Sequence, residues 1–319
     1  MSKFSADELL DEVYGRTGAD DERVVVGPGP GEDAAGVQVG DETLVVSTDP
    51  ISMAADRIGQ LAVTIVTNTV AAAGGDPRYL TSTVLLPEHD TDLLGEVVGQ
   101  IDETASDLDQ SVVAGHSESV VGLDRPLVSM TALGRADSFV PTSGAEPGDD
   151  VVLTKAAGIE ATGVLATDYR EHLDGVDDDT VERARAFFDD VSIIPDAAAV
   201  RSHANAMHDP TEGGVLAGLV DLALAADVTI DVARDDVPVR EETRALCEAA
   251  GVDPLRVLCS GGLLAAVPSD ESDAVLAACA DAGIDAAVVG TVADGDAGVS
   301  LDGERFEAPP TDEVYELLE

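Results

Sequence analysis

Apolar residues recur along the first part of the chain with two spacings, one typical of helices and one of strands. Between residues 57 and 73, Ile58, Leu61 and Ile65 repeat every three or four positions and share one helix face. Runs rich in valine predict strands, and the capping box Ser5 to Glu8 predicts a first helix start. The expected order is helix 5–14, strands 23–26 and 43–47, helix 57–73, strand 79–86, helix 90–108, and strands 111–115 and 126–134.

A loop-rich segment over residues 141–149 divides the sequence. It consists mainly of Pro, Thr, Ser, Gly and acidic residues, which favour turns. We therefore expect two domains, residues 1–143 and residues 144–319. Helices and strands alternate in the second, which indicates helices layered on a sheet. Its expected elements are strand 150–154, helices 159–170, 178–190, 195–206 and 213–226, strand 228–232, helix 239–250, strand 263–267, helix 271–282 and strand 286–292.

Acidic residues are spread along the whole sequence. There are 64 Asp and Glu against 17 Lys and Arg, so the formal net charge is −47. A compact chain with this charge repels itself at low ionic strength, whereas at ~1 M salt the Debye length falls to about 3 Å. The composition therefore predicts a protein adapted to molar salt. It also argues against nucleic acid as a partner, because nucleic-acid binding needs a basic surface.

Apolar residues make up 45% of the chain, enough for sizeable cores. No apolar run reaches the ~18 to 20 residues of a membrane helix, and the acidic N-terminus lacks the apolar core of a signal peptide. We therefore expect a soluble, cytoplasmic protein without a membrane partner. The cysteines, Cys247, Cys259 and Cys279, form no Cys-x-x-Cys pair and are expected to be buried thiols.

A glycine-rich, acidic loop follows the first strand, over residues 27–36. Glycines such as Gly29 and Gly31 allow the backbone to approach a ligand closely. The loop has neither the Gly-Lys-Ser/Thr of a Walker loop nor a Rossmann fingerprint. Because Glu32 and Asp33 would repel a bare phosphate, a phosphate here requires a cation such as Mg²⁺ between them. A simple turn with solvated acids is the alternative.

Further polar residues lie at the end of one apolar element and inside another. Asp49 follows the valine-rich strand 43–47, where it is a candidate second metal ligand or a cap for the following turn. Asn68 and Thr69 interrupt the apolar face of the 57–73 helix. Buried polar groups need partners, which here are either a ligand or the backbone.

Three further segments carry candidate chemistry. Gly115, His116, Ser117 and Glu118 come directly after an apolar strand. The loop 208–214 precedes an apolar helix, whose first backbone N–H groups suit an anion. Lys155, one of only two lysines, follows a strand and is either a point charge for a phosphate or a chance survivor.

Taken together, these segments resemble the PurM-like superfamily. This superfamily includes aminoimidazole ribonucleotide (AIR) synthetase, thiamine-monophosphate kinase, selenophosphate synthetase and the HypE-like hydrogenase-maturation dehydratase. The resemblance extends over nearly the whole chain and is closest to an AIR synthase-related branch of salt-adapted archaea. The segments that carry it are 31–35, 47–49, 67–69, 115–118, 154–160, 208–214, 260–264 and 289–292.

The resemblance implies a two-domain fold of mixed α+β and α/β character. The N-terminal domain would be ferredoxin-like and would form a β-barrel with a second copy in a homodimer, and the C-terminal domain would be α/β. ATP and Mg²⁺ would bind in a cleft near the interface, together with a small-molecule substrate.

The motifs and the resemblance together give one candidate site. Its proposed members are the metal ligands Glu32, Asp33 and Asp49; the nucleotide contacts Gly29, Gly31, Asn68, Gly115, Glu118, Thr211, Gly213 and Gly214; and the catalytic residues His116, Lys155 and Asp209.

The leading function implied is ATP-dependent phosphoryl transfer to an oxygen of a small amide- or carboxylate-type substrate. A thiamine-monophosphate kinase-like activity is the first alternative, although the kinase branch has aspartate at the positions of Thr69 and His116. A non-catalytic nucleotide- or partner-binding protein is the second. The maturation dehydratases use a cysteine at the extreme C-terminus, where this sequence reads Tyr315 to Glu319.

Overall fold

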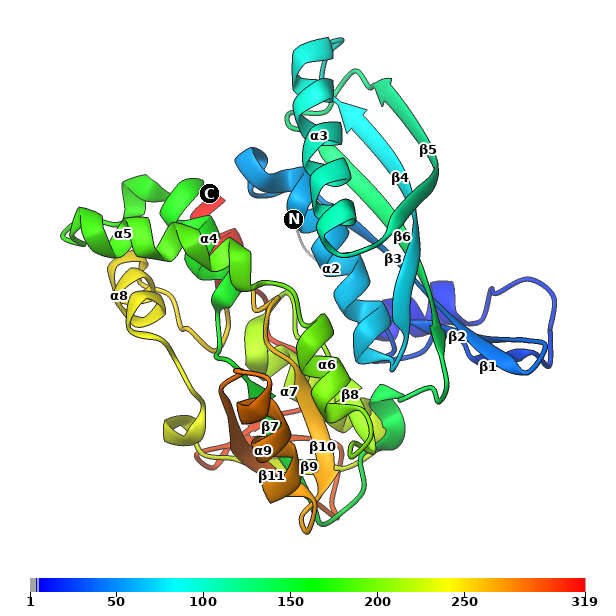
Figure 1. Ribbon diagram of the computed structural model, residues 1–319. Helices are drawn as coiled ribbons and strands as arrows, with labels where there is room; N and C mark the ends of the chain where they lie inside the picture. The colour runs from blue at the N-terminus through cyan, green and yellow to red at the C-terminus, as the bar shows by residue number, and fades with distance from the viewer. Residues whose placement is uncertain (1–3, 5, 319) are drawn as a thin grey trace.

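The computed structural model describes residue 4 and residues 6–318 and contains two sheets, each covered by helices (Figure 1). The first sheet has the strand order β1-β2-β3-β6-β4-β5. All neighbours are antiparallel except the parallel pair β4–β5. Its elements are β1 (Val24–Val26), β2 (Ala35–Val39), β3 (Glu42–Ile51), α2 (Ile58–Ala72), β4 (Asp76–Leu86), α3 (Thr91–Asp107), β5 (Ser111–Ser119) and β6 (Leu127–Ala136).

Helices α2 and α3 cover one face of this sheet. Strand β6 shows the reason, since Val128 and Met130 are buried towards the helices while Ser129 and Thr131 alternate onto the other, half-exposed face. Helix α2 is buried almost all round, because its residues belong to the core of the first sheet and also to cores of the second half of the chain. It is therefore the central element between the two halves.

The second sheet has the order β13-β12-β9-β11-β7-β10-β8. Helix α7 packs on one face, and α6 and α9 pack on the other. Its elements are β7 (Asp149–Thr154), α6 (Ile194–Val200), β8 (Ala206–His208), α7 (Gly214–Ala226), β9 (Thr229–Val232), β10 (Leu264–Pro268), α9 (Ser272–Asp281), β11 (Ala286–Ala293), β12 (Gly298–Leu301) and β13 (Glu304–Phe306).

A separate group of helices lies beside α2. Helices α4 (Ile159–Thr167), α5 (Asp178–Arg185) and α8 (Glu241–Ala250) share one apolar core. Met53 and Leu61 from the first half, and Val314 from the C-terminal segment, complete that core. The two halves are thus joined by apolar packing along α2.

Most predicted helices are confirmed. Helical periodicity located α2, α3, α4, α7, α8 and α9 to within a few residues. The helix expected over 195–206 is shorter, because residues 206–208 pair with β10 as strand β8. Strands β2, β12 and β13 were not predicted. The first helix is described from Ala6 (α1, Ala6–Leu9, continued by a π-helical turn, Leu10–Tyr14), so the expected cap Ser5 lies outside the described residues.

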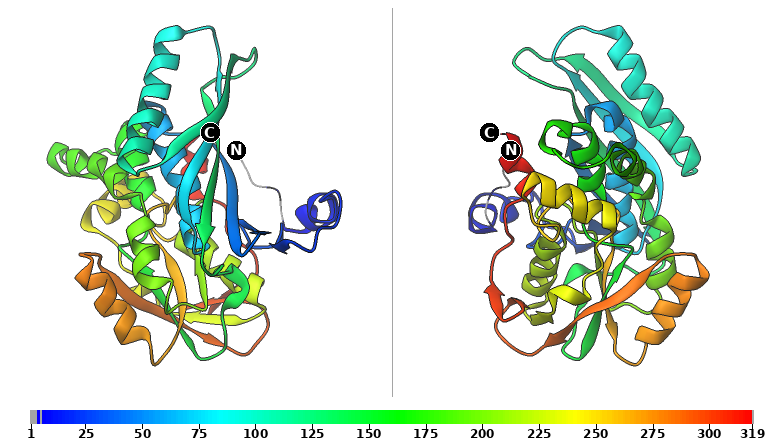
Figure 2. Two further views of the ribbon diagram at one scale, coloured as in Figure 1. Left: turned by 45° about the vertical axis from the view of Figure 1, so that its right-hand side comes forward. Right: turned by 90° about the vertical axis from the view of Figure 1, so that its left-hand side faces the viewer.

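The β-barrel expected from the first sheets of two copies stays a prediction. The first sheet is open, with β1 and β5 as its two edges. The chain passes from β6 to β7 through residues 137–148, and the division between residues 143 and 144 stays a prediction. Figure 2 shows the β1–β2 hairpin and the first helix projecting away from the body of the molecule.

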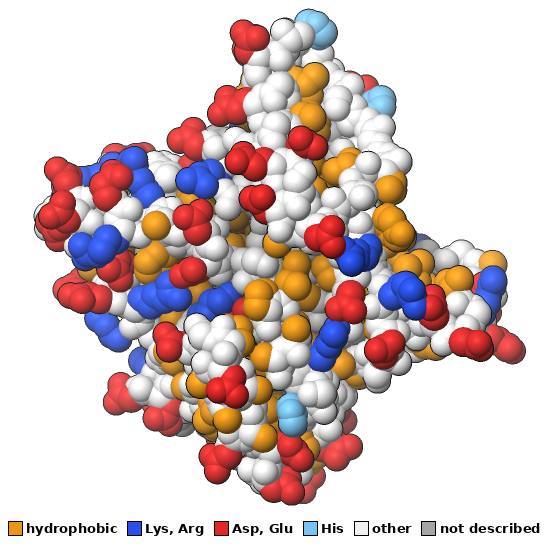
Figure 3. Space-filling model, viewed as in Figure 1, with side chains coloured by type: hydrophobic (Ala, Val, Ile, Leu, Met, Phe, Trp, Pro, Cys, Tyr) orange, Lys and Arg blue, Asp and Glu red, His pale blue; other side chains and the backbone are white. Residues whose placement is uncertain are grey.

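Acidic side chains are scattered over the visible surface rather than gathered in one place (Figure 3). Arginines are fewer, and many of them pair with a neighbouring acid, as Arg183 does with Glu242 and Arg234 with Asp253. Among the described helices, none combines the length and the apolar character needed to cross a bilayer.

Candidate active site

Helix α2 presents two polar side chains to the second half of the chain. The Asn68 amide is 1% exposed; its Nδ2 donates to the carbonyl of Val191 (2.8 Å) and its Oδ1 accepts from the amide of Ile193 (2.9 Å). Both ends of this side chain are engaged by the protein, so Asn68 links the two halves of the chain. The nucleotide contact expected for Asn68 stays a prediction. Thr69 Oγ1 donates to Asp209 Oδ2 (3.0 Å).

The acidic loop lies against helix α7. Gly31 has φ +72°, and a β-carbon there would come within 2.7 Å of the carbonyl oxygen of Asp221. A side chain at this position would therefore force the loop away from the helix. Gly29 closes the preceding turn, since its carbonyl accepts from the amide of Glu32 (3.2 Å). The two glycines thus shape the loop that carries Asp33.

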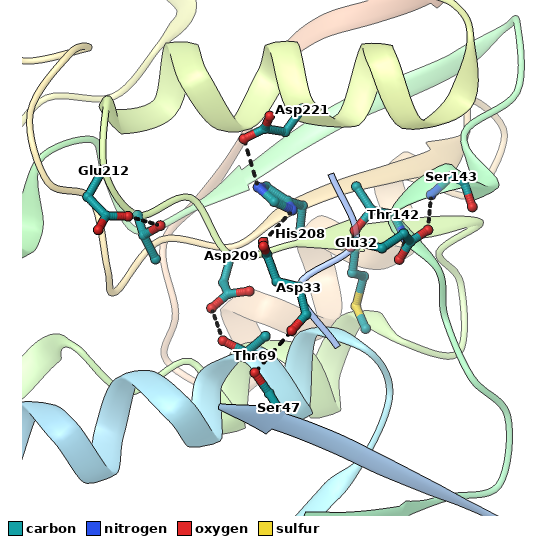
Figure 4. Close-up of polar contacts among 12 residues, drawn as sticks. Glu32, Asp33, Ser47, Thr69, Thr142, Ser143, His208, Asp209, Glu212 and Asp221 are labelled. Atoms are coloured by element: carbon teal, nitrogen blue, oxygen red, sulfur yellow. Dashed lines mark hydrogen bonds and ion pairs between the residues drawn. The ribbon is translucent and has the colours of Figure 1, made fainter. Parts of the chain in front are cut away.

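Glu32 faces away from the other acids (Figure 4). Its Oε2 accepts from the amide of Thr142 (3.2 Å) and its Oε1 from the amide of Ser143 (3.0 Å). The carboxylate therefore holds the connection between β6 and β7. The expected role of Glu32 as a metal ligand beside Asp33 stays a prediction, since each carboxylate oxygen keeps a further lone pair.

Asp33, Asp49 and Asp209 form the acidic group of the site. Ser47 Oγ donates to the Asp33 carbonyl (3.1 Å) and to Asp49 Oδ2 (3.3 Å), which ties the loop to strand β3. Asp209 is 4% exposed, and burial, followed by the charges of Asp33 and Asp49, holds its pKa well above the usual range. The charges of Asp33 and Asp49 therefore act on the buried Asp209 carboxyl group, and the catalytic role expected for Asp209 stays a prediction.

His208 lies between two carboxylates. Its Nδ1 is 3.8 Å from Asp33 Oδ2 and its Nε2 is 3.9 Å from Asp221 Oδ2 (Figure 4). The imidazole is 4% exposed, and it lines a narrow pocket together with Asp33, Thr69 and Asp209. Sequence reasoning placed His208 in a motif but gave it no role, and it missed Asp221, which the apolar pattern of its helix conceals.

The donor set suits Mg²⁺, a hard cation that prefers carboxylate oxygens. A buried carboxyl group beside two further acids is costly unless it is protonated or balanced by a cation. Within residues 4 and 6–318, no three His, Cys, Asp or Glu side chains already meet as a preformed metal cluster. Asp33 is about half exposed and so has room to adjust.

The loop at the start of α7 faces a different neighbour. The amide of Gly213 donates to Asp312 Oδ2 (2.7 Å), and Thr211 Oγ1 donates to Glu212 Oε2 (3.0 Å). At Gly214, φ is +71° and a β-carbon would meet the carbonyl of Leu255 at 2.6 Å. The amide of Gly213 is therefore occupied by a carboxylate of the C-terminal segment. The nucleotide contacts expected for Thr211, Gly213 and Gly214 stay predictions.

The motif at residues 115–118 lies inside strand β5, which is exposed along its whole length. His116 Nε2 is 3.4 Å from Glu118 Oε2, and both side chains are exposed. In the sheet order, β4 and β6 separate β5 from the strand that carries Asp49. This chain therefore does not bring Gly115, His116 and Glu118 to the acidic group.

Lys155 is engaged by the protein itself. Its Nζ donates to the carbonyls of Asp190 (3.1 Å), Ser192 (2.7 Å) and Gly261 (3.1 Å), and it lies 3.1 Å from Asp196 Oδ2. An ammonium has three donors, and all are used. These contacts fix α6 to the end of β7, and the phosphate contact and catalytic role expected for Lys155 stay predictions.

Comparison with known proteins identifies the relatives of this chain. The AIR synthase related protein N-terminal domain matches residues 31–136, and the AIR synthase related protein C-terminal domain matches residues 146–302. The carbamoyl dehydratase HypE of Rhizobium leguminosarum bv. viciae is 30% identical over 277 residues, which cover 82% of this chain and 77% of that protein.

Solved structures agree with this relationship. E. coli HypE, a hydrogenase maturation protein, superposes with a TM-score of 0.70 and 26% identity over 82% of this chain and 84% of that one. AaThiL complexed with AMPPCP and TMP has a TM-score of 0.79 at 20% identity over 96% of both chains, which establishes the shared fold. The PurM-like resemblance is confirmed, and the chain belongs to the AIR synthase related protein family.

Proposed function

We propose that this protein transfers the terminal phosphoryl group of ATP to an oxygen of a small amide- or carboxylate-type substrate. The convergence of Asp33, Asp49 and Asp209 at the junction of the two halves carries this proposal. Two similar proteins support it: AaThiL, whose structure was solved with AMPPCP and TMP, and the carbamoyl dehydratase HypE. In the reaction, the bond from the terminal phosphorus to the bridging oxygen of ATP breaks and a bond to the acceptor oxygen forms, releasing ADP.

Asp33, Asp49 and Asp209 would hold Mg²⁺, and the ion would supply positive charge that offsets the charge of the phosphates. The protein supplies mainly positioning. Thr69 orients the Asp209 carboxyl group, Ser47 ties Asp49 to the backbone of Asp33, and Gly31 lets the acidic loop rest on α7. Asp33, Thr69 and Asp209 line one narrow pocket.

Two other functions have specific support. A thiamine-monophosphate kinase-like activity is supported by the fold shared with AaThiL, but Thr69 stands where that branch is expected to have a third acid. A nucleotide- or partner-binding protein without turnover is supported by the remote position of His116. In both alternatives the same acids would hold the metal.

We also propose a homodimer formed through the first sheet. Among the described residues, α2 and α3 pack on one and the same face of that sheet, and its edge strand β5 is exposed throughout. Tyr79, Val112 and Val113 are exposed apolar side chains on this sheet, and such patches mark interaction surfaces. Light scattering in about 3 M KCl should give twice the chain mass, and a monomer at micromolar concentration contradicts the proposal.

A nucleotide turnover assay tests the proposed function. With Mg²⁺ and about 3 M KCl, ATP should be converted to ADP faster when a primary amide or a carboxylate is added. Acceleration by thiamine monophosphate alone would favour the kinase. Tight binding of ATP with no turnover on any acceptor would favour the binding protein.

A further inference from the structure

Lys155 has a backbone conformation that its residue type does not explain. It directly follows β7, and its φ is +54°, in the left-handed region that favours glycine. It is also one of only two lysines in a chain of 319 residues. A long side chain persists at such a backbone position when its surroundings hold it there. The reason for a lysine at this position therefore lies in the contacts of its side chain.

The ammonium group of Lys155 is surrounded by four oxygen atoms, which we call the ammonium cage. They are the carbonyl oxygens of Ser192 (2.7 Å from Nζ), Asp190 (3.1 Å) and Gly261 (3.1 Å), and Oδ2 of Asp196 (3.1 Å). Asp196 is fully buried. Several carbonyl oxygens directed at one point also bind monovalent metal ions, because they replace the hydration shell of the ion. The ammonium cage therefore has the donor set of a monovalent-cation site.

The carboxylate of the ammonium cage depends on Lys155 for its counter-charge. Both oxygens of Asp196 are buried, and within the described part of the chain they accept no hydrogen bond of standard geometry. A carboxylate that is removed from water in this way is costly unless a cation balances it. The ammonium supplies that charge while its three N–H groups donate to the carbonyls. An empty ammonium cage would leave the buried charge of Asp196 uncompensated.

The ammonium cage also holds the segment that joins the second half of the chain to α2. Along residues 190–193, successive backbone groups bind Lys155 and Asn68 in alternation. Helix α6, which carries Asp196, packs against the end of α2 (Figure 1). A cation in the ammonium cage therefore stabilises the junction between the two halves of the chain.

We propose that Lys155 serves as the cation of a monovalent-cation site, and that this site binds K⁺ or an ion of similar size once the lysine side chain is removed. The inference is independent of the proposed function, since it involves neither nucleotide nor acceptor. Lys155→Gly opens the ammonium cage without backbone strain, because φ is +54° at this position. Lys155→Met leaves an unbranched apolar chain in the ammonium cage and removes the charge.

Thermal melts of the full-length protein in two salts test the inference. In about 3 M KCl, K⁺ should enter the opened cage of Lys155→Gly, whereas tetramethylammonium at the same concentration is too large to enter. Relative to the wild type, the Tm of Lys155→Gly should therefore be lowered by several degrees more in tetramethylammonium chloride than in KCl. Lys155→Met should lose the same amount in both salts. Arg16→Ala, which removes the positive charge of an exposed ion pair with Glu12, should follow the wild type.

Rubidium, a heavier ion of similar size to K⁺, locates the site directly. Crystals of Lys155→Gly grown with RbCl should show anomalous scattering at the position of the Lys155 Nζ, and crystals of the wild type should show none there. The inference is overturned if Lys155→Gly and the wild type respond equally to the change of salt, if Lys155→Gly does not fold in KCl, or if the ammonium cage holds no rubidium. A salt response of Lys155→Met equal to that of Lys155→Gly would also overturn it, because the effect would then arise outside the ammonium cage.

Discussion

Thr69 donates a hydrogen bond from Oγ1 to Oδ2 of Asp209, at 3.0 Å, across the junction between the first sheet and the second half of the chain. Thr69 lies on α2 and Asp209 on the loop before α7. The bond orients a carboxyl group that is almost fully buried, and burial and nearby charges raise the pKa of that group. A hydroxyl at this position adds no charge to the acidic group, whereas an aspartate would add a fourth carboxylate.

The fold should weaken as salt is removed. Acids are scattered over the surface of a chain with net charge −47 (Figure 3), and their repulsion grows as the Debye length increases from about 3 Å at ~1 M salt to about 10 Å at ~0.1 M. Thermal melts should therefore show a lower Tm at about 0.1 M KCl than at about 3 M. An unchanged Tm over this range would contradict the prediction that the protein is adapted to molar salt.

Asn68 should contribute to stability rather than to nucleotide binding. Asn68→Ala leaves the carbonyl of Val191 and the amide of Ile193 buried without their partner. Unsatisfied groups of this kind cost about 1–3 kcal/mol each, so denaturant unfolding should show a loss on the order of 3 kcal/mol. Gln38→Ala, which removes exposed hydrogen bonds to Gly40 and Glu42, serves as control. A stable Asn68→Ala protein that has lost ATP affinity would restore the nucleotide role.

Glu160 should make the protein less stable as the pH rises. The pKa of Glu160 is about 7 in the folded protein against an ordinary value of 4.5, so the folded state holds the proton more tightly than the unfolded state. The contribution of the protonated Glu160 carboxyl group to the free energy of unfolding is fully present below about pH 4.5 and is lost as the pH rises through about 7. Above that range, Glu160→Gln should be more stable than the wild type by up to about 3 kcal/mol. The difference should vanish near about pH 4.

Denaturant unfolding from about pH 4 to about pH 8 measures this difference. Glu88→Gln, at an exposed position, should parallel the wild type throughout. A Glu160→Gln curve that also parallels the wild type would show that the carboxyl group titrates normally in the folded state.

Local sequence patterns were sufficient to predict most of the helices and part of the candidate site. The 3.6-residue period located α2, and the polar interruption at Asn68 and Thr69 correctly indicated a buried polar contact. The family motifs nominated Asp33, Asp49 and Asp209 separately, and their mutual influence follows from the fold. Residue type and spacing worked here because each signal is confined to one element.

Contacts between distant segments were not predictable in this way. Asp312 occupies the amide of Gly213, and Glu32 caps Thr142 and Ser143, across about a hundred residues of chain in each case. The end of β5 is set by its pairing with β4, which continues to Ser119 opposite Leu86 and draws His116 into an exposed edge strand. The short strands β12 and β13 lack the length for a clear period.

The binding of Mg·ATP to Asp33→Asn and Asp49→Asn tests the central claim most directly. Both substitutions remove charge from the acidic group but keep side-chain shape. Asp33 is about half exposed, so the folded state of Asp33→Asn should be nearly as stable as the wild type. Calorimetry in about 3 M KCl should show Mg·ATP affinity reduced about a hundredfold or more in each variant, with Glu88→Gln unchanged. Undiminished Mg·ATP affinity in both aspartate variants would contradict the assignment of these acids to the metal.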